Sequence, residues 1–105
     1  MLYSELQCSE AIHKAVERMG FAEMTEIQEK TIPLMLAGHD VIAKAPTGTG
    51  KTCAFGVPMV QRIQPEKGYV QGVILCPTRE LCLQITEELQ KLGKYIPGFS
   101  IVAAV

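Results

Sequence analysis

A glycine-rich segment that ends in Gly-Lys-Thr carries the clearest chemical signal in the sequence. The segment reads Ala45-Pro46-Thr47-Gly48-Thr49-Gly50-Lys51-Thr52. It follows an apolar stretch at residues 40–44 and precedes a stretch with helical character. Backbone N–H groups in such a turn converge on an anion, and the following helix N-terminus adds partial positive charge. The spacing therefore predicts a nucleotide phosphate-binding loop, in which Lys51 reaches the outer phosphates and the Thr52 hydroxyl ligates Mg²⁺ as the metal ligand. Lys51 and Thr52 are the catalytic candidates.

The alternative is a flexible glycine turn with a surface lysine. The apolar stretch before the segment and the helical stretch after it argue against this alternative, because a phosphate loop joins a strand to a helix. One position departs from the strict pattern, which has glycine where this chain has Ala45. A small residue suffices there if its backbone keeps a negative φ.

Length and composition fit one small packed domain. The chain has 105 residues, 48% of them hydrophobic, and a net charge of −1. A basic surface is absent, so any nucleic-acid binding must depend on local geometry rather than on overall charge. No stretch is long and apolar enough for a membrane span, and the N-terminus lacks the features of a signal peptide.

The cysteine pattern indicates a reducing compartment and no metal centre. The cysteines are Cys8, Cys53, Cys76 and Cys82. They are far apart in the sequence, none forms a Cys-x-x-Cys pair, and the two histidines are isolated from them. We therefore expect a cytoplasmic protein in which the cysteines act as small hydrophobic side chains.

Four stretches of the sequence predict helices. They begin at Ser9, at Thr25, after the phosphate loop and at Thr78. The third runs to about Arg62, and the last reaches about Leu92. Ser9 and Thr78 are candidate N-caps, and Thr25 with Gln28 fits a capping box. Pro33 is expected to kink or break the second helix and Pro58 to interrupt or bend the third, because proline lacks the backbone donor. The core stripe of the last helix is expected at Leu81, Ile85, Leu89 and Leu92.

Apolar runs at residues 40–44, 72–76 and 100–105 predict strands. Because they alternate with helices, they predict an α/β fold, with a parallel sheet covered by helices on both faces. Ala45 and Pro77 both follow the carboxyl ends of predicted strands, where ligands bind in such sheets. The last run ends without a closing residue, so we expect the chain to be a truncated piece of a longer protein.

Three segments, in this order and at these separations, resemble the DEAD-box ATP-dependent RNA helicases. Residues 20–28, Gly20-Phe21-Ala22-Glu23-Met24-Thr25-Glu26-Ile27-Gln28, resemble the Q motif, which recognises adenine. Residues 45–52 resemble motif I. Residues 77–84, Pro77-Thr78-Arg79-Glu80-Leu81-Cys82-Leu83-Gln84, resemble motif Ia, which touches the RNA backbone. Tyr3 lies where the family carries an isolated aromatic residue, most often Phe, and is expected to pack beneath the Q motif.

The chain also departs from the family pattern. Met24 and Glu26 occupy positions where the family commonly has proline, and Cys82 replaces a usual alanine. The larger departure is that the Asp-Glu-Ala-Asp segment, the Ser-Ala-Thr motif and the second RecA-like domain are not in the sequence. The chain alone is therefore expected to bind adenine nucleotide weakly at best and to hydrolyse none.

The resemblance implies a three-layer αβα RecA-like P-loop NTPase fold, truncated, with residues 1–105 forming the N-terminal portion of the first RecA-like domain. It implies ATP and Mg²⁺ as cofactors, single-stranded or duplex RNA bound through its backbone, and a second RecA-like domain in the parent chain. The implied ATP-binding residues are Phe21, Gln28, Ala45, Pro46, Thr47, Gly48, Thr49, Gly50, Lys51 and Thr52. The implied RNA-binding residues are Pro77, Thr78 and Arg79.

Each of these residues also allows a purely structural role. Gln28 can serve only as the partner of Thr25 in the capping box, and Phe21 only as a core aromatic between two helices. Thr78 can merely cap its helix, and Arg79 can merely pair with a nearby carboxylate such as Glu80.

Two other function classes stay open. One is a DNA-directed helicase or translocase of the same superfamily, and the other is a small self-contained P-loop nucleotide-binding or kinase module. Gln28 with its upstream aromatic residues, and the segment at 77–81, favour the RNA helicase over the DNA-directed enzyme. A small kinase needs an arginine-rich lid or acceptor site after the loop, and only Arg62 and Arg79 follow it.

Overall fold

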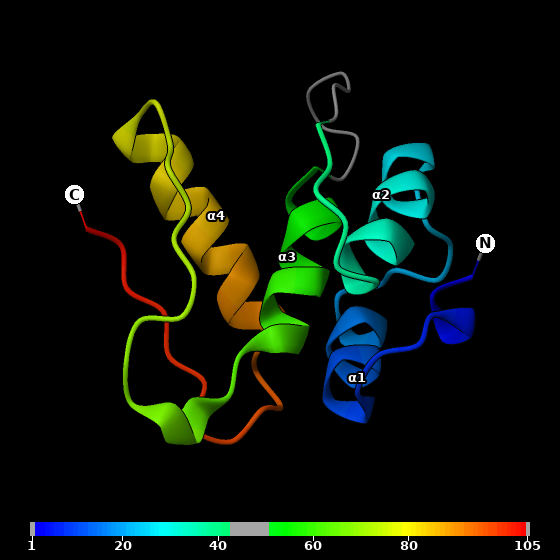
Figure 1. Ribbon diagram of the computed structural model, residues 1–105, viewed down its shortest axis with the longest axis horizontal. Helices are drawn as coiled ribbons and strands as arrows, with labels where there is room; N and C mark the ends of the chain where they lie inside the picture. Colours follow the sequence, from blue (N-terminus) through cyan, green and yellow to red (C-terminus); the bar gives the residue numbers. More distant parts are fainter. Residues whose placement is uncertain (1, 43–50, 105) are drawn as a thin grey trace.

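The computed structural model describes residues 2–42 and 51–104, without the side chain of Lys51. Within these ranges the chain forms α-helices joined by turns, short 3₁₀ helices and extended segments (Figure 1). In chain order the elements are η1 (Tyr3–Glu5), α1 (Glu10–Arg18), α2 (Glu26–Leu36), α3 (Lys51–Arg62), η2 (Pro65–Lys67) and α4 (Arg79–Leu92). None of the described helices combines the length and the apolar character needed to cross a membrane.

Three helices begin at the hydroxyl residues that the sequence predicts. The side chain of Ser9 accepts a hydrogen bond from the backbone N–H of Ile12 at the start of α1. Thr25 caps α2, and Thr78 caps α4 by accepting from the N–H of Leu81 at 3.2 Å. Such caps satisfy backbone donors that have no partner within the helix, and each contributes about 1 kcal/mol.

The two internal prolines do not end their helices. α2 runs through Pro33 to Leu36, and α3 runs through Pro58 to Arg62. Of the kink or break predicted at Pro33, the break does not occur. A proline removes one backbone hydrogen bond, and the packing of α2 against α3 keeps the rest of the helix in place.

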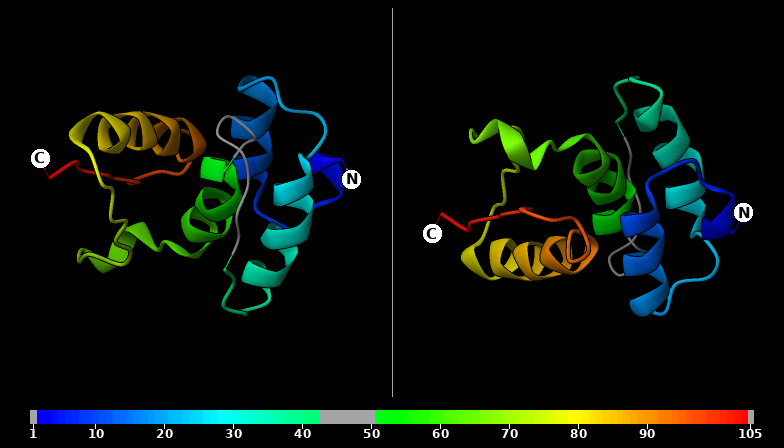
Figure 2. Two further views of the ribbon diagram at one scale, coloured as in Figure 1. Left: turned by 90° about the horizontal axis from the view of Figure 1, so that it is seen from above. Right: turned by 90° about the horizontal axis from the view of Figure 1, so that it is seen from below.

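α3 lies at the centre of the molecule, with α2 on one side and α4 on the other (Figure 1). Figure 2 shows α1 beside the C-terminal end of α4, against which it packs. The core combines side chains from all four helices that are less than 3% exposed. These are Ile12 and Val16 from α1, Ile32 from α2, Cys53, Val57 and Val60 from α3, and Leu89 and Leu92 from α4.

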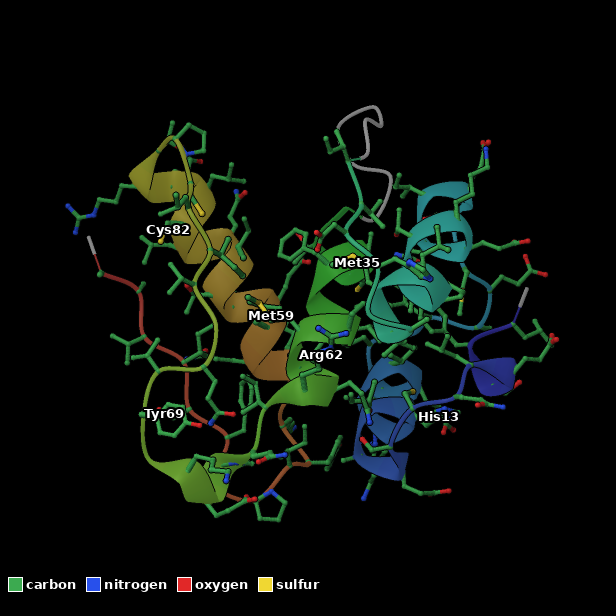
Figure 3. All side chains as sticks on the ribbon, viewed as in Figure 1. His13, Met35, Met59, Arg62, Tyr69 and Cys82 are labelled. Carbon is green, nitrogen blue, oxygen red and sulfur yellow. The ribbon has the colours of Figure 1, made fainter. Side chains whose placement is uncertain are left out.

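Polar contacts tie the ends of these helices together. Arg62, at the end of α3, donates from Nη2 to the backbone oxygen of Met35 at 3.0 Å, near the end of α2. Both side chains are labelled in Figure 3. Gln61 accepts a hydrogen bond from the N–H of Ser9 at 2.8 Å, which joins α3 to the start of α1. The three helices therefore form one packed unit with α3 as the common partner.

The crossing of α3 and α4 depends on Gly56, which leads to a first prediction. A Cβ atom at this position would lie 2.7 Å from Cδ2 of Leu89 and 3.0 Å from Cδ1 of Leu92. Both leucines are buried in the core, with exposed fractions of 2% and 0%. Gly56→Ala is therefore expected to lower the free energy of unfolding by about 1–3 kcal/mol, measured by chemical denaturation. Gly72→Ala is the matched control, because its Cβ would meet only the tip of the flexible Met59 side chain. Equal stability of the two variants would contradict the packing described here.

The parallel sheet predicted from the sequence is not formed within the described residues. Residues 72–76 and 101–104 are extended but pair with no neighbouring strand, and residues 40–42 are likewise unpaired. A β-strand requires a partner for its backbone groups, and these segments have no such partner within the described residues. Val73, Leu75 and Val102 are between 71% and 92% exposed as a result. The one β-type pairing described is an isolated antiparallel bridge between Leu2 and Glu23.

The same arrangement explains why the predicted core stripe of α4 is only partly buried. Leu89 and Leu92 pack into the core, whereas Ile85 is half-buried and Leu81 is 39% exposed. The N-terminal half of α4 faces a cavity of about 650 Å³ that the two extended segments border. The predicted stripe therefore lies on the correct face of α4, and the burial of its residues decreases toward the start of the helix.

Candidate nucleotide-binding site

The helices that carry the three predicted motifs begin at one end of the molecule. In Figure 1, α2, α3 and α4 all start at the upper end and run downward. This end therefore collects Gln28 in the first turn of α2, Thr52 in the first turn of α3 and Thr78 at the cap of α4. Unpaired N–H groups and the helix dipoles make such an end attractive to anions.

Gln28 is fixed by the capping box that the sequence predicts. Its backbone N–H donates to Oγ1 of Thr25 at 3.4 Å, and its side-chain Oε1 accepts from the N–H of Thr25 at 3.1 Å. The side chain is only 2% exposed. The capping role of Gln28 is therefore confirmed. Recognition of adenine by Gln28 is a separate prediction. The capping role and the recognition role are compatible with each other.

Tyr3 adds a second donor to the same oxygen atom. Its hydroxyl donates a buried hydrogen bond to Oε1 of Gln28. The backbone N–H of Tyr3 donates to the oxygen of Ala22 at 2.9 Å, so the N-terminal segment is held against residues 20–24. The expectation that Tyr3 packs beneath the Q motif is confirmed. The two donors together set the orientation of the Gln28 amide.

Sequence reasoning missed the role of the Tyr3 hydroxyl. The signal was the residue type itself, because the family usually has a phenylalanine at this position, which cannot donate a hydrogen bond. The bond spans 25 positions in the sequence, so no local pattern indicated its partner.

Phe21 lies at the surface beside Tyr3. Its ring is stacked on the Tyr3 ring with centroids 6.2 Å apart and an interplanar angle of 22°. Phe21 is 39% exposed and borders a cavity of about 280 Å³. The alternative of a core aromatic clamped between helices does not agree with this exposure. An exposed aromatic face can stack on a planar base.

Tyr3→Phe tests the hydrogen bond without removing the ring. The substitution leaves Oε1 of Gln28 with one donor fewer in a buried position, so the free energy of unfolding is expected to fall by about 1–2 kcal/mol. Chemical denaturation measures the change. Tyr69→Phe is the matched control, since Tyr69 is 66% exposed. A Tyr3→Phe variant as stable as the Tyr69→Phe variant would mean that the bond contributes nothing.

Beneath Tyr3 lies the thiol of Cys53, and both groups favour their neutral forms. Burial raises the pKa of Tyr3 above its usual range, and the nearby Cys53 adds to the rise. Burial also raises the pKa of Cys53 from 9.0 to about 11, with a further contribution from Glu88. A buried, protonated thiol of this kind is chemically inert. The location of Cys53 directly after the predicted phosphate loop therefore does not make it reactive.

The raised pKa of Cys53 predicts a pH dependence of stability. The folded pKa exceeds the unfolded one, so the contribution is complete below pH 9 and is lost as the pH rises from 9 toward 11. The loss is at most about 1.4 kcal/mol per pH unit. Unfolding curves recorded across this range should decline more steeply for the parent protein than for Cys53→Ala. Parallel declines would show that Cys53 titrates equally in both states.

Of the predicted phosphate loop, residues 45–52, the part at 45–50 lies outside the described residues, as does the Lys51 side chain. The described part begins at Lys51, which is the first residue of α3. A helix therefore begins directly after the loop, as the sequence predicts, and its N-terminus suits a phosphate group. Thr52 is half-buried in the first turn. Its hydroxyl is a hard oxygen donor of the kind that Mg²⁺ accepts, so the residues fit an ATP–Mg²⁺ complex.

The described part of the chain holds no other group of ligands for a metal. No cluster of three or more His, Cys, Asp or Glu side chains occurs there.

Pro77, Thr78 and Arg79 are exposed at the start of α4. The hydroxyl of Thr78 caps the helix, which confirms the structural role of this residue. Arg79 makes no ion pair with Glu80 in the part of the chain that the structure describes, so the alternative of a local carboxylate partner is not supported. The guanidinium group and the first-turn N–H groups are open to a phosphate from solvent.

Comparison with known proteins agrees with the three motifs. The family model described as DEAD/DEAH box helicase matches residues 25–105. The DEAD-box ATP-dependent RNA helicase CshA of Bacillus licheniformis is 52% identical over 92 residues, which cover 88% of this chain and 19% of that protein. The ATP-dependent RNA helicase CshA of Listeria monocytogenes is 57% identical over 91 residues, covering 87% and 18%.

Solved structures give the same result. S. cerevisiae Dbp5 bound to RNA and ADP BeF3 superposes with a TM-score of 0.86 at 36% identity, covering 90% of this chain and 25% of that one. A DEAD box protein from the hyperthermophile Methanococcus jannaschii gives a TM-score of 0.83 at 38% identity, covering 88% and 25%. The described helices thus have the arrangement found in RecA-like DEAD-box domains. The chain spans about a fifth of the length of the curated relatives it matches. Over that span, the chain belongs to the DEAD/DEAH box helicase family.

Proposed function

We propose that the protein is an ATP-dependent RNA helicase and that this chain forms the nucleotide-binding end of its first RecA-like domain. The observation that carries the proposal is that the three motif-bearing helices begin at one end of the molecule, with Gln28, Thr52 and Thr78 in or before their first turns. The CshA relatives are named ATP-dependent RNA helicases, which supports ATP and RNA as ligands. So does the Dbp5 structure, which was solved with RNA and ADP BeF3.

In this proposal the nucleotide binds by its base and by its phosphates. The base would lie against Phe21, and the Gln28 amide would read its edge. The phosphates would lie at the N-terminus of α3, in contact with residues 45–50 and the Lys51 ammonium. Thr52 would contribute an oxygen to Mg²⁺, which supplies charge neutralisation for phosphoryl transfer when it is bound.

RNA would bind at the start of α4. Pro77, Thr78 and Arg79 are exposed there, and the helix N-terminus favours a backbone phosphate. Contacts of this kind position a strand and carry no sequence information. The net charge of −1 agrees with a few local contacts rather than a broad basic surface.

We further propose that residues 72–76 and 101–104 are strands of a parallel sheet in the complete domain. Their exposed apolar side chains, such as Leu75 and Val102, support this assignment, because strands of parallel sheets are buried on both faces. A second RecA-like domain and a cytoplasmic location belong to the same proposal.

The chain alone should not hydrolyse ATP. Phosphoryl transfer to water requires an acid that holds Mg²⁺ and a group that positions the attacking water. The sequence contains one aspartate, Asp40, and no Asp-Glu-Ala-Asp segment. ATP hydrolysis is therefore a property that we assign to the full-length protein.

The test is ATP hydrolysis and strand separation by the full-length protein. RNA is expected to stimulate hydrolysis, and a short RNA duplex is expected to be separated only when ATP and Mg²⁺ are both present. Stimulation by DNA in preference to RNA would favour the DNA-directed alternative. Transfer of phosphate to a small acceptor, with no nucleic-acid stimulation, would favour the kinase alternative.

A further inference from the structure

Two cysteines meet at the start of α4, although they are separated by five residues in the sequence. Cys76 lies two residues before the Thr78 cap, in the extended segment that leads into the helix, and Cys82 is the fourth residue of α4. A helical side chain tilts toward the N-terminus and covers the turn before its own Cα. This tilt directs Cys82 toward the incoming chain. Figure 3 shows Cys82 at this end of α4, beside the extended segment.

The two thiols share three features of their surroundings. Both line the cavity of about 650 Å³ next to α4, both are free, and both are partly exposed. Partial burial raises the pKa of Cys76, and the Cys82 thiol beside it adds to the rise. Cys53 differs in kind, because it is 2% exposed in the core.

We propose that Cys76 and Cys82 are a redox-sensitive pair that a low-molecular-weight disulfide, such as glutathione disulfide, converts to an intramolecular disulfide. One cysteine thiolate attacks a sulfur of the small disulfide, whose S–S bond breaks and releases one small thiol. The second cysteine thiolate then attacks the resulting mixed disulfide and releases the other small thiol. The protein pair loses two electrons and two protons, and the two released thiols carry them.

The disulfide would close a ring over residues 76–82. This ring contains Thr78 and Arg79, so oxidation would limit the conformational freedom of the turn that we assign to RNA. The formation of the disulfide does not depend on that assignment. It rests on the proximity of two thiols, and a mass measurement detects it whether or not the protein binds RNA.

The sequence provides a direct assay, because trypsin cuts between the two cysteines. Cleavage after Lys67, Arg79 and Lys91 places Cys76 in peptide 68–79 and Cys82 in peptide 80–91. The full-length protein is treated with glutathione disulfide at mildly alkaline pH, alkylated, digested and analysed by mass spectrometry. The expected product is the two peptides joined by a disulfide, with loss of alkylation at both cysteines. Dithiothreitol should release them.

Three controls make the result decisive. Cys82→Ser should leave glutathione attached to Cys76 and give no joined peptide. Cys8→Ser, the matched control at a distant cysteine, should leave the joined product unchanged. The same treatment in urea should lower its yield, because unfolding separates the thiols. Separate glutathione adducts on the two peptides of the folded parent protein, or full alkylation of both cysteines, would overturn the proposal.

Discussion

Lys51→Ala is expected to abolish measurable ATP binding by the full-length protein. A charge-assisted contact from an ammonium group to phosphate contributes about 1.5–3 kcal/mol, which corresponds to a loss of affinity of about tenfold to about 150-fold. Lys51 is the first residue of α3, so the substitution changes a helix end and leaves the core residues of α3 in place. Titration calorimetry or fluorescence titration with a labelled ATP measures the loss.

Lys67→Ala is the matched control for this variant. Lys67 is exposed in η2, at the opposite end of α3 from Lys51, and its replacement should leave ATP affinity unchanged. The Lys51→Ala variant should also keep the stability of the parent protein. Undiminished ATP binding by a folded Lys51→Ala protein would contradict the prediction that residues 45–52 bind the phosphates.

Gln28→Ala is expected to abolish the preference of the full-length protein for ATP over GTP, while binding of the nucleotide phosphates is retained. The Gln28 amide offers both a donor and an acceptor, which matches the edge of adenine. The same substitution removes one half of the capping box and leaves the Tyr3 hydroxyl without its partner. A loss of stability of about 1–2 kcal/mol should therefore accompany it.

Gln28→Glu separates the two roles of this residue. A carboxylate can still accept from the N–H of Thr25 and from the Tyr3 hydroxyl, and glutamate is a favoured residue at this position of a capping box. It cannot donate a hydrogen bond to a base. A buried carboxylate costs some stability, so the comparison is made on folded protein. Recognition of adenine predicts that folded Gln28→Glu loses the preference for ATP. Retention of that preference in a stable Gln28→Glu protein would leave capping as the only role of Gln28.

The parts of the fold that the sequence predicted well are those set by neighbours in the chain. A cap is a contact across three residues, so local spacing was enough to assign Ser9, Thr25 and Thr78. The helical phase of α4 followed for the same reason, since Leu89 and Leu92 are buried as expected. Of the kink or break expected at Pro33, the break did not occur, because packing between helices outweighed a local penalty.

The parts that the sequence could not predict depend on distant contacts. The bond from Tyr3 to Gln28 and the meeting of Cys76 with Cys82 both arise from the way the chain folds back. The predicted sheet differs, because its strands were expected from local sequence but are not paired in the structure. Apolar runs such as residues 72–76 have strand character, but a strand forms only where a partner supplies hydrogen bonds, and the described residues offer none to this segment. The motif residues of the candidate site were found from residue type and spacing, and the predicted strand ends placed Ala45 and Pro77 at one edge. That α2, which carries Gln28, begins at the same end of the molecule required the structure.

Backbone hydrogen exchange, followed by mass spectrometry, tests the central claim most directly. The full-length protein is compared with and without Mg²⁺ and a non-hydrolysable ATP analogue at saturating concentration. If main-chain amides hold the phosphates, exchange should slow at residues 46–52 and in the first turn of α2 around Gln28. Unchanged exchange in both segments, under conditions where the nucleotide is bound, would contradict a nucleotide site at the end where α2 and α3 begin.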